Sequence, residues 1–303
     1  MQTFMNISDK KELLTLNPAL TWVYLLVEWG LIIGTAILTE YFSHPAVYLA
    51  SVIVIGSRQH ALGFHYHEAC HGLLFRNRKW NDRVGVLCMG WPLFVDLAPY
   101  RNTHLRHHAN TNTSNDPDWV DNQPEQLKSA RGFLQKFVVL SGFDRKLGRA
   151  LGLFLKKDTQ GKKDSKLLKY GYYMLLFAAL AFFSLLEEFF LYWLVPFIFY
   201  LLPVMRFRGI SEHWATCNSD SLTSTRTVIV SRLTQFLLYP KNTNFHLEHH
   251  LFPHIPFYNL PRAHAILMRD DIYRTNAHIT RGLRGLFREI CQYGNRFGYP
   301  GSR

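Results

Sequence analysis

The histidines of this chain are gathered into groups whose spacing is that of metal ligands. The chain has 15 histidines among its 303 residues. Residues three or four apart on a helix share one face, with Cβ atoms about 5–6 Å apart, so two such imidazoles can reach the same ion. Nine histidines are candidate ligands on this basis, eight in three clusters and His213 alone between the second and third: His67, His71, His104, His107, His108, His213, His246, His249 and His250.

A His-x-x-His-His cluster offers more than one chelating pair. It contains an i, i+3 pair and an i, i+4 pair within one helical turn, so it can contribute ligands to two metals at once. Neutral imidazole suits iron, zinc, copper and nickel. We therefore predict a metal centre, with His65 as a supporting neighbour of the first cluster. The remaining histidines are interpreted as unrelated to the centre: His44, His60, His254, His264 and His278.

The first cluster allows a second interpretation. His67-Glu68-x-x-His71 is also the pattern of a zinc metalloprotease, in which Glu68 would act as the general base. That motif requires two histidines and a third ligand, so it leaves six clustered histidines without a role. Metal analysis separates the two hypotheses, since the protease binds one zinc ion and the larger cage binds two metals.

Four apolar segments must position these clusters. Residues 20–38, 46–64, 170–186 and 189–207 are each long enough, at 1.5 Å per residue, to cross a bilayer core of about 30 Å. Short breaks at residues 39–45 and 187–188 separate the members of each pair. We predict an all-α integral membrane protein with four transmembrane helices in two hairpins, forming one membrane-embedded domain over residues 1–303. Residues 84–98, 133–155 and 228–239 are expected to be interfacial segments, the last two amphipathic helices.

The distribution of cations gives the orientation. None of the 34 Lys and Arg residues lies in the two breaks, whereas 18 lie in residues 65–169 and 13 in residues 206–303. Cytoplasmic loops of membrane proteins are rich in Lys and Arg. Both termini and the active site are therefore predicted to be cytoplasmic. The net charge of +12 is explained in this way without a nucleic-acid partner. A soluble helical protein with buried core helices is the alternative.

The same layout brings the histidines to one level. His67 lies 21 residues, about 31 Å of helix, after the start of the second segment, and His213 lies 24 residues, about 36 Å, after the start of the fourth. Both segments are predicted to enter from the far side of the membrane. The remaining clusters lie in the predicted cytoplasmic cap, residues 65–169 and 208–303, outside the hydrocarbon where polar side chains are costly.

Three stretches of the sequence resemble the histidine boxes of the membrane-bound fatty acid desaturase family. They are His67-Glu68-Ala69-Cys70-His71-Gly72, Tyr100-Arg101-Asn102-Thr103-His104-Leu105-Arg106-His107-His108 and Asn244-Phe245-His246-Leu247-Glu248-His249-His250-Leu251-Phe252-Pro253. The resemblance runs from about residue 65 to residue 264. It implies two iron ions held by the nine histidines, with no bridging carboxylate. It also implies that Glu68, Glu212 and Glu248 orient ligand imidazoles.

The resemblance further implies an activity. Such an enzyme uses O₂ to oxidise a C–H bond of a lipid, most often introducing a double bond into an acyl chain carried by a lipid, CoA or a carrier protein. Hydroxylation or ketone formation, for instance on a carotenoid, is the alternative for the same cage. The third box begins with His246, where some branches have Gln. With no fused cytochrome domain in the sequence, a separate electron donor is expected, such as a ferredoxin or a b-type cytochrome.

Overall fold

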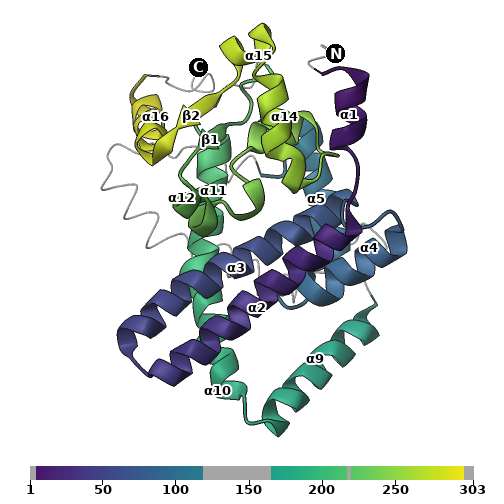
Figure 1. The fold of residues 1–303 in the computed structure, drawn as a ribbon, viewed down its shortest axis with the longest axis vertical. Helices are drawn as coiled ribbons and strands as arrows, with labels where there is room; N and C mark the ends of the chain where they lie inside the picture. The colour runs from purple at the N-terminus through teal and green to yellow at the C-terminus, as the bar shows by residue number, and fades with distance from the viewer. Residues whose placement is uncertain (1–4, 119–164, 217–219, 297–303) are drawn as a thin grey trace. The chain divides into compact units, whose positions relative to one another are not determined.

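Helices make up most of the described chain (Figure 1). The structure, a computed structural model, describes residues 5–118, 165–216 and 220–296. The α-helices are α1 (Ile7–Leu13), α2 (Pro18–Phe42), α3 (Pro45–His71), α4 (Arg78–Gly85), α5 (Leu97–Asn110), α9 (Lys166–Phe182), α10 (Leu186–Phe189), α11 (Leu202–His213), α12 (Arg232–Leu238), α13 (His246–Leu251), α14 (Leu260–Leu267), α15 (Asp271–Asn276) and α16 (Gly282–Arg296). Strands β1 (Thr227–Ile229) and β2 (Ile279–Arg281) form a parallel pair. Shorter helical turns are π-helical at Val86–Gly90, Phe190–Leu194 and Phe197–Leu201 and 3₁₀ at Pro240–Asn242 and Phe257–Asn259.

The chain divides into two compact units, each assembled from separated segments. The first unit comprises residues 1–15, 104–141 and 206–303, and the second comprises residues 16–103 and 142–205. Three of the four predicted membrane segments lie wholly in the second unit, and the fourth lies there up to residue 205. Most of the predicted cap belongs to the first unit. A single membrane-embedded domain over residues 1–303 stays a prediction.

Helices α2 and α3 form the first predicted hairpin, and the sequence explains its turn. Asn17 caps the start of α2, and the side chain of His44 accepts a hydrogen bond from the amide of Ala46 at the start of α3. Each helix has proline at its first position, where the missing N–H costs nothing. Ser43, with φ 44°, ends α2 in the left-handed conformation. His44 thus has a capping role, consistent with its exclusion from the metal centre.

The two charged residues that interrupt these apolar segments bind each other. Arg58 Nη1 donates to Glu28 Oε2 at 3.1 Å, and both side chains are at most 5% exposed. Charged groups within spanning helices usually face the bundle interior and are paired. Leu26 and Ile37 of α2 are more than 60% exposed on the outside, as expected for side chains in contact with lipid.

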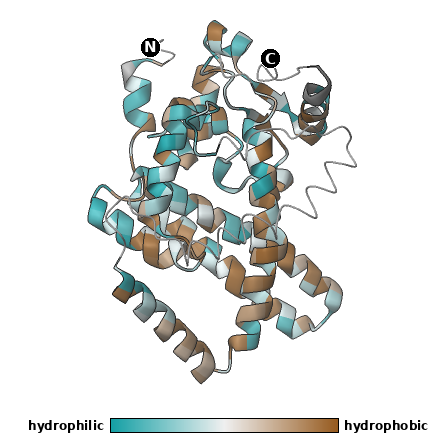
Figure 2. Ribbon diagram, turned by 180° about the vertical axis from the view of Figure 1, so that it is seen from behind, coloured by the Kyte–Doolittle hydropathy of each residue, from teal (hydrophilic) through white to brown (hydrophobic). Residues whose placement is uncertain are grey.

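Two helices of the described residues have the length and apolar composition needed to cross a membrane. They are Pro18–Phe42 and the continuous helix Leu186–His213, whose hydrophobic residues are brown in Figure 2. Two π-helical turns, Phe190–Leu194 and Phe197–Leu201, interrupt the latter helix. Pro196 and Pro203 lie just beyond these turns, and a proline removes an i→i−4 hydrogen bond. The four-span layout and its orientation stay predictions.

The second predicted hairpin turns at a different place. The break was expected at Glu187 and Glu188, but α9 ends at Phe182 and Ser184 has φ 56°. The amide of Leu185 donates to the carbonyl of Leu180 at 2.7 Å, which closes the helix end. Both glutamates instead lie in the first turn of α10. Negative charge is favourable there because it faces the positive end of the helix dipole.

One predicted interfacial helix is partly a strand. In the predicted amphipathic helix 228–239, only Arg232–Leu238 is helical, as α12. Val228 belongs to β1 and pairs with Thr280 of β2. Val228 is fully buried in a cluster with Phe207, Tyr239 and Leu286. This parallel pairing joins residues about fifty apart, which local periodicity does not reveal. The predicted segment 133–155 lies outside the described residues, and residues 84–98 contain a π-helical turn followed by irregular chain before α5.

Candidate metal centre

The second histidine box lies on α5 and its three members point in two directions. His104 and His108 are four residues apart, and their Nε2 atoms are 3.0 Å from each other. The ring of His107 lies 6.1 Å from that of His104 and approaches a different set of histidines. One helical turn therefore supplies ligands to two places, as the His-x-x-His-His spacing predicts.

The third box divides in the same way on α13. His249 Nε2 lies 3.1 Å from His108 Nε2, which defines a three-histidine cluster of His104, His108 and His249. The rings of His246 and His250 are 4.5 Å apart and belong to the other set. A helix of only six residues is not stable by itself. Other elements must therefore fix its orientation.

The second set is completed by the last residue of α11. His213 Nε2 lies 2.9 Å from His246 Nε2. The ligand atoms of His107, His213, His246 and His250 all lie within 4.8 Å of one another, and we call these residues the four-histidine cluster. His107, His213 and His246 are each less than 9% exposed. Because all four lie in the first unit, this cluster is fully defined within one compact body.

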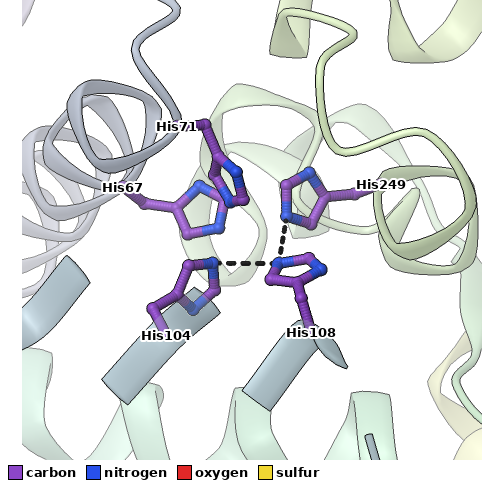
Figure 3. A group of neighbouring side chains, drawn as sticks. All are labelled: His67, His71, His104, His108 and His249. Atoms are coloured by element: carbon purple, nitrogen blue, oxygen red, sulfur yellow. Dashed lines mark hydrogen bonds between the residues drawn. The ribbon is translucent and has the colours of Figure 1, made fainter. Parts of the chain in front are cut away.

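His67 and His71 lie one turn apart on α3, in the second unit. Their ring centroids are 4.8 Å apart. Figure 3 shows both side chains extending from α3, and its dashed lines join His108 to His104 and to His249. The spacing of the first box thus brings the two imidazoles together, and their role as metal ligands stays a prediction.

A network around Arg101 fixes the end of α3 directly behind this pair. Gly72 adopts φ 80°, and the carbonyls of the last turn need partners. Arg101 Nε donates to the carbonyl of Cys70 at 2.9 Å, and its Nη2 donates to that of Ala69 at 2.9 Å. The same guanidinium binds both oxygens of Asp82, at 3.0 and 2.6 Å. Arg101 belongs to the second box sequence but lies in the second unit with α3.

Hydrogen bonds fix the tautomer of His107. Its Nδ1 lies 2.9 and 3.0 Å from the two carboxylate oxygens of Asp116, whose side chain is completely buried. An ionised carboxylate only accepts hydrogen bonds, so Nδ1 carries the proton and Nε2 keeps its lone pair. A carboxylate bound to the second nitrogen of an imidazole is the usual way of orienting a metal ligand.

The tautomer of His250 follows from a similar argument. The Thr111 hydroxyl donates to the carbonyl of His107 at 2.9 Å, and its oxygen lies 3.1 Å from His250 Nδ1. Because the Thr111 hydroxyl already donates its proton to the carbonyl of His107, Nδ1 of His250 must be the donor in the bond to Thr111. The Nε2 atom of His250 is buried and has no hydrogen-bond partner among the described residues. A buried lone pair without a partner is costly unless a metal ion binds it.

Burial affects the protonation of two histidines of this cluster. Burial lowers the pKa of His246 and of His250 well below the usual value, and neighbouring histidines lower it further. Metal ions bind neutral imidazole. His246 and His250 are therefore in the ligand form before any metal binds.

The distances also fit a metal. Metal–imidazole bonds of about 2.1 Å place two nitrogens bound at right angles about 3.0 Å apart. The three Nε2–Nε2 distances between His104 and His108, His108 and His249, and His213 and His246 are 3.0, 3.1 and 2.9 Å. Both clusters within the first unit therefore suit transition-metal binding.

The three glutamates expected to orient ligands have different surroundings. Glu212 accepts a hydrogen bond from Arg208 Nε at 2.6 Å and lies 3.6 Å from His246 Nε2. Glu68 Oε1 lies 4.0 Å from His67 Nδ1. Whether they orient metal-bound imidazoles stays a prediction.

Glu248 connects four elements of the first unit. Its fully buried carboxylate accepts hydrogen bonds from Thr227 of β1, His264 of α14 at 2.5 Å and Tyr273 of α15 at 2.6 Å. None of these donors is a candidate ligand. Because Glu248 lies between His246 and His249 in sequence, these bonds fasten the short helix that carries the third box.

Sequence reasoning missed several residues that support the centre. Asp116, Thr111 and Tyr273 were not selected, and His264, interpreted as unrelated, bonds Glu248. One signal was available for Asp116, since Asp116 and Asp118 form an acidic pair just after the second box of a basic chain. His264 and Tyr273 had no such signal, because they reach the centre from helices distant in sequence. His254 is exposed.

Comparison with known proteins decides the family. The sequence pattern of the family described as fatty acid desaturase matches residues 43–282. The chain belongs to the fatty acid desaturase family. It is 28% identical to the dihydrorhizobitoxine desaturase of Bradyrhizobium elkanii, over 91% of this chain and 83% of that protein. It is 26% identical to the sn-1 oleoyl-lipid 12-desaturase of Synechocystis, over 67% of this chain and 63% of that protein. It is also 26% identical to a β-carotene 4-ketolase of Protosiphon botryoides, over 70% of this chain and 50% of that protein.

Membership of the desaturase family has two consequences. The named relatives are desaturases and ketolases, so the protein is an oxidoreductase. The metalloprotease alternative, which used only His67, Glu68 and His71, receives no support from the comparisons. The family assignment also agrees with the resemblance that the three histidine boxes indicated.

Proposed function

We propose that this desaturase-family protein holds two iron ions and uses them with O₂ to oxidise a C–H bond of a lipid substrate. The four-histidine cluster would hold one iron through His107, His213, His246 and His250. Its fixed tautomers carry the proposal, because Asp116 and Thr111 leave the Nε2 lone pairs of His107 and His250 available to a metal. Neutral imidazole is a common ligand of iron.

The second iron would be held by His104, His108 and His249 together with His67 and His71 of α3. Three imidazoles leave positions open on an ion that accepts five or six ligands. The i, i+4 pair on α3, with its helix end fixed by Arg101, provides two more. The sequence supports this assignment through the order and spacing of the three boxes.

The reaction that we propose removes two hydrogens from neighbouring methylene groups. Bound iron would supply the oxidising power by activating O₂. The balance requires an external donor, since reduction of O₂ to two waters takes four electrons and the new double bond provides only two. The protein's part is to hold neutral ligands in a buried site, where water has little access.

Ketone formation or hydroxylation of a lipid is the second candidate. Among the relatives are β-carotene 4-ketolases as well as fatty acid desaturases. We favour desaturation because the relative that matches 91% of this chain is a desaturase. The acyl chain would be carried by a lipid, CoA or a carrier protein, and the electrons would come from a ferredoxin or a b-type cytochrome.

We also propose that both termini and the metal centre face the cytoplasm. A cysteine introduced at Ser43, in the turn between α2 and α3, should react with a membrane-impermeant reagent added outside intact cells. A cysteine introduced at Ser231, beside β1 in the cap, should react only after lysis. Labelling of the cysteine at position 231 in intact cells would show that the orientation is the opposite of the one proposed.

The metal and the reaction can be tested together. The full-length protein in nanodiscs should contain about two irons per chain, and lipids from an expressing host should contain a new double bond detectable by mass spectrometry. His250→Ala should lose iron and product together, because it removes a metal-directed lone pair. His254→Ala is the matched control, since His254 is exposed. Two irons and normal turnover in His250→Ala would show that the cage is wrongly assigned.

A further inference from the structure

Helix α16 has one apolar face and one strongly basic face. Its inward side chains Leu286 and Ile290 are buried against Phe207, Trp214 and Val228. The outward face begins at the end of β2 and carries Arg281, Arg284 and Arg288, all of them exposed. Arg284 and Arg288, four residues apart, share one side of the helix, and Arg281 is the last residue of β2, directly before the helix. In Figure 1, α16 follows directly from β2 at one edge of the first unit.

The basic face lacks neutralising carboxylates within the part of the chain that the structure describes. No ion pair to Arg281, Arg284 or Arg288 is found among the described residues. The one acidic residue of α16, Glu289, is partly exposed and accepts hydrogen bonds from Thr280 at 2.9 and 2.8 Å. Phe287, 39% exposed, lies between the arginines in sequence. Exposed arginine beside an aromatic side chain is the composition enriched in protein interfaces.

The inner face of α16 is linked to the four-histidine cluster through a buried arginine. Glu289 Oε2 lies 3.2 Å from Nε of Arg226, whose side chain is completely buried. Arg226 in turn donates to the carbonyl of Ser211 at 2.9 Å and to that of Trp214 at 2.8 Å. These two residues flank the ligand His213. The side chains of Glu289 and Arg226 therefore connect α16 to the backbone around His213, a proposed metal ligand.

We propose that Arg281 at the end of β2, together with Arg284 and Arg288 of α16, forms the docking surface for an acidic one-electron carrier protein. The inference rests on the proposed function, whose electron balance requires two electrons from outside. A carrier must approach the metals closely to transfer them, and this face is tied to the metal cluster by Glu289 and Arg226. Arginine forms bidentate pairs with carboxylates, which favours an acidic protein surface. Such charges raise association rates through steering.

The test compares two charge reversals of equal size. Arg284→Glu with Arg288→Glu changes the basic face, and Arg269→Glu with Arg274→Glu changes two other exposed arginines of the first unit. The full-length protein is placed in nanodiscs of zwitterionic lipid. Binding of a plant-type [2Fe–2S] ferredoxin and of a soluble b-type cytochrome is measured at low and high salt, without any turnover.

The α16 reversal should weaken binding of at least one carrier by about tenfold or more, and the wild-type affinity should fall with salt. The Arg269 and Arg274 reversal should change it less than threefold. Iron reduction by dithionite should be equal in all three proteins, because this small reductant needs no docking surface. Equal binding of the two reversals, or no binding of either carrier by the wild type, would overturn the proposal.

Two further outcomes separate this proposal from others. If the α16 reversal leaves carrier binding intact but weakens association with nanodiscs containing anionic lipid, the face contacts the membrane and the docking proposal is wrong. If carriers bind through α16 but no lipid oxidation occurs with any reductant, the proposed reaction fails while the docking surface stands. Carrier binding and product formation are thus judged by independent measurements.

Discussion

Asp116→Asn tests how the structure prepares a metal ligand. The buried carboxylate of Asp116 accepts hydrogen bonds from His107 Nδ1 and from the amides of Asn112 and Asp118, at 2.8–3.0 Å. Asparagine keeps the shape but loses the charge and replaces one acceptor oxygen with an NH₂ donor. At least one of the three N–H groups then faces another donor, which costs about 1–3 kcal/mol.

The loss should appear in metal affinity. Removing a partner that orients a metal-bound imidazole typically lowers affinity about 10–100-fold, equivalent to about 1.4–2.7 kcal/mol. The assay is a chelator titration of the iron-loaded protein in nanodiscs, followed as iron retained per chain. Asp116→Asn should release part of its iron at a chelator concentration about 10–100-fold lower than the wild type requires.

Asp118→Asn is the control. The Asp118 carboxylate is 3.8 Å from His107 Nδ1, but its side chain is 48% exposed, whereas that of Asp116 is 0% exposed. Solvent weakens the exposed interaction, so Asp118→Asn should change iron retention less than threefold. Equal losses in the two variants, or no loss in Asp116→Asn, would refute the argument that a buried carboxylate fixes the tautomer of His107. Unfolding of the iron-free proteins separates metal loss from misfolding.

Three other results are expected. Tyr273→Phe removes a donor to the buried Glu248 carboxylate, so the free energy of unfolding should fall by about 1.5–3 kcal/mol, measured by chemical denaturation; an unchanged value would contradict the network. Arg101→Lys loses the bidentate pair with Asp82 and should lower the free energy of unfolding by about 1–2 kcal/mol. A double-mutant cycle should show that this loss is coupled to that of Asp82→Asn. The pKa of His250 is lowered in the folded protein, so at acidic pH the unfolded chain binds a proton that the folded chain does not. The metal-free protein should therefore lose stability as pH falls below about 6.5, by up to about 1.4 kcal/mol per pH unit. His250→Gln should reduce this dependence of stability on pH.

The sequence predicted which histidines group together better than it predicted their surroundings, and the reason is physical. Spacings of three and four residues, as in His104, His107 and His108, are local and determine which side chains share a helix face. Asp116 could be suspected because it lies only eight residues beyond the box. Glu248 is different, because its partners His264 and Tyr273 come from helices 16 and 25 residues away, and such contacts depend on tertiary packing.

The fold shows the same division between local and distant information. The α2–α3 turn was predicted because Pro45 and the polar residues before it end one apolar segment and begin the next. The strand at Val228 was predicted as helix, because its partner Thr280 lies about fifty residues away. The turn at Ser184 was misplaced by three residues, since a left-handed serine has no sequence signal as clear as two adjacent acids.

The second and third histidine boxes are each shared between the two clusters, and this sharing makes their loading with metal interdependent. Helix α5 gives His107 to one cluster and His104 and His108 to the other, and α13 gives His246 and His250 to one and His249 to the other. An ion that enters either cluster immobilises both helices, and so lowers the entropy that the second ion must overcome. Partly loaded protein should therefore be rare, with most chains carrying both metals or neither.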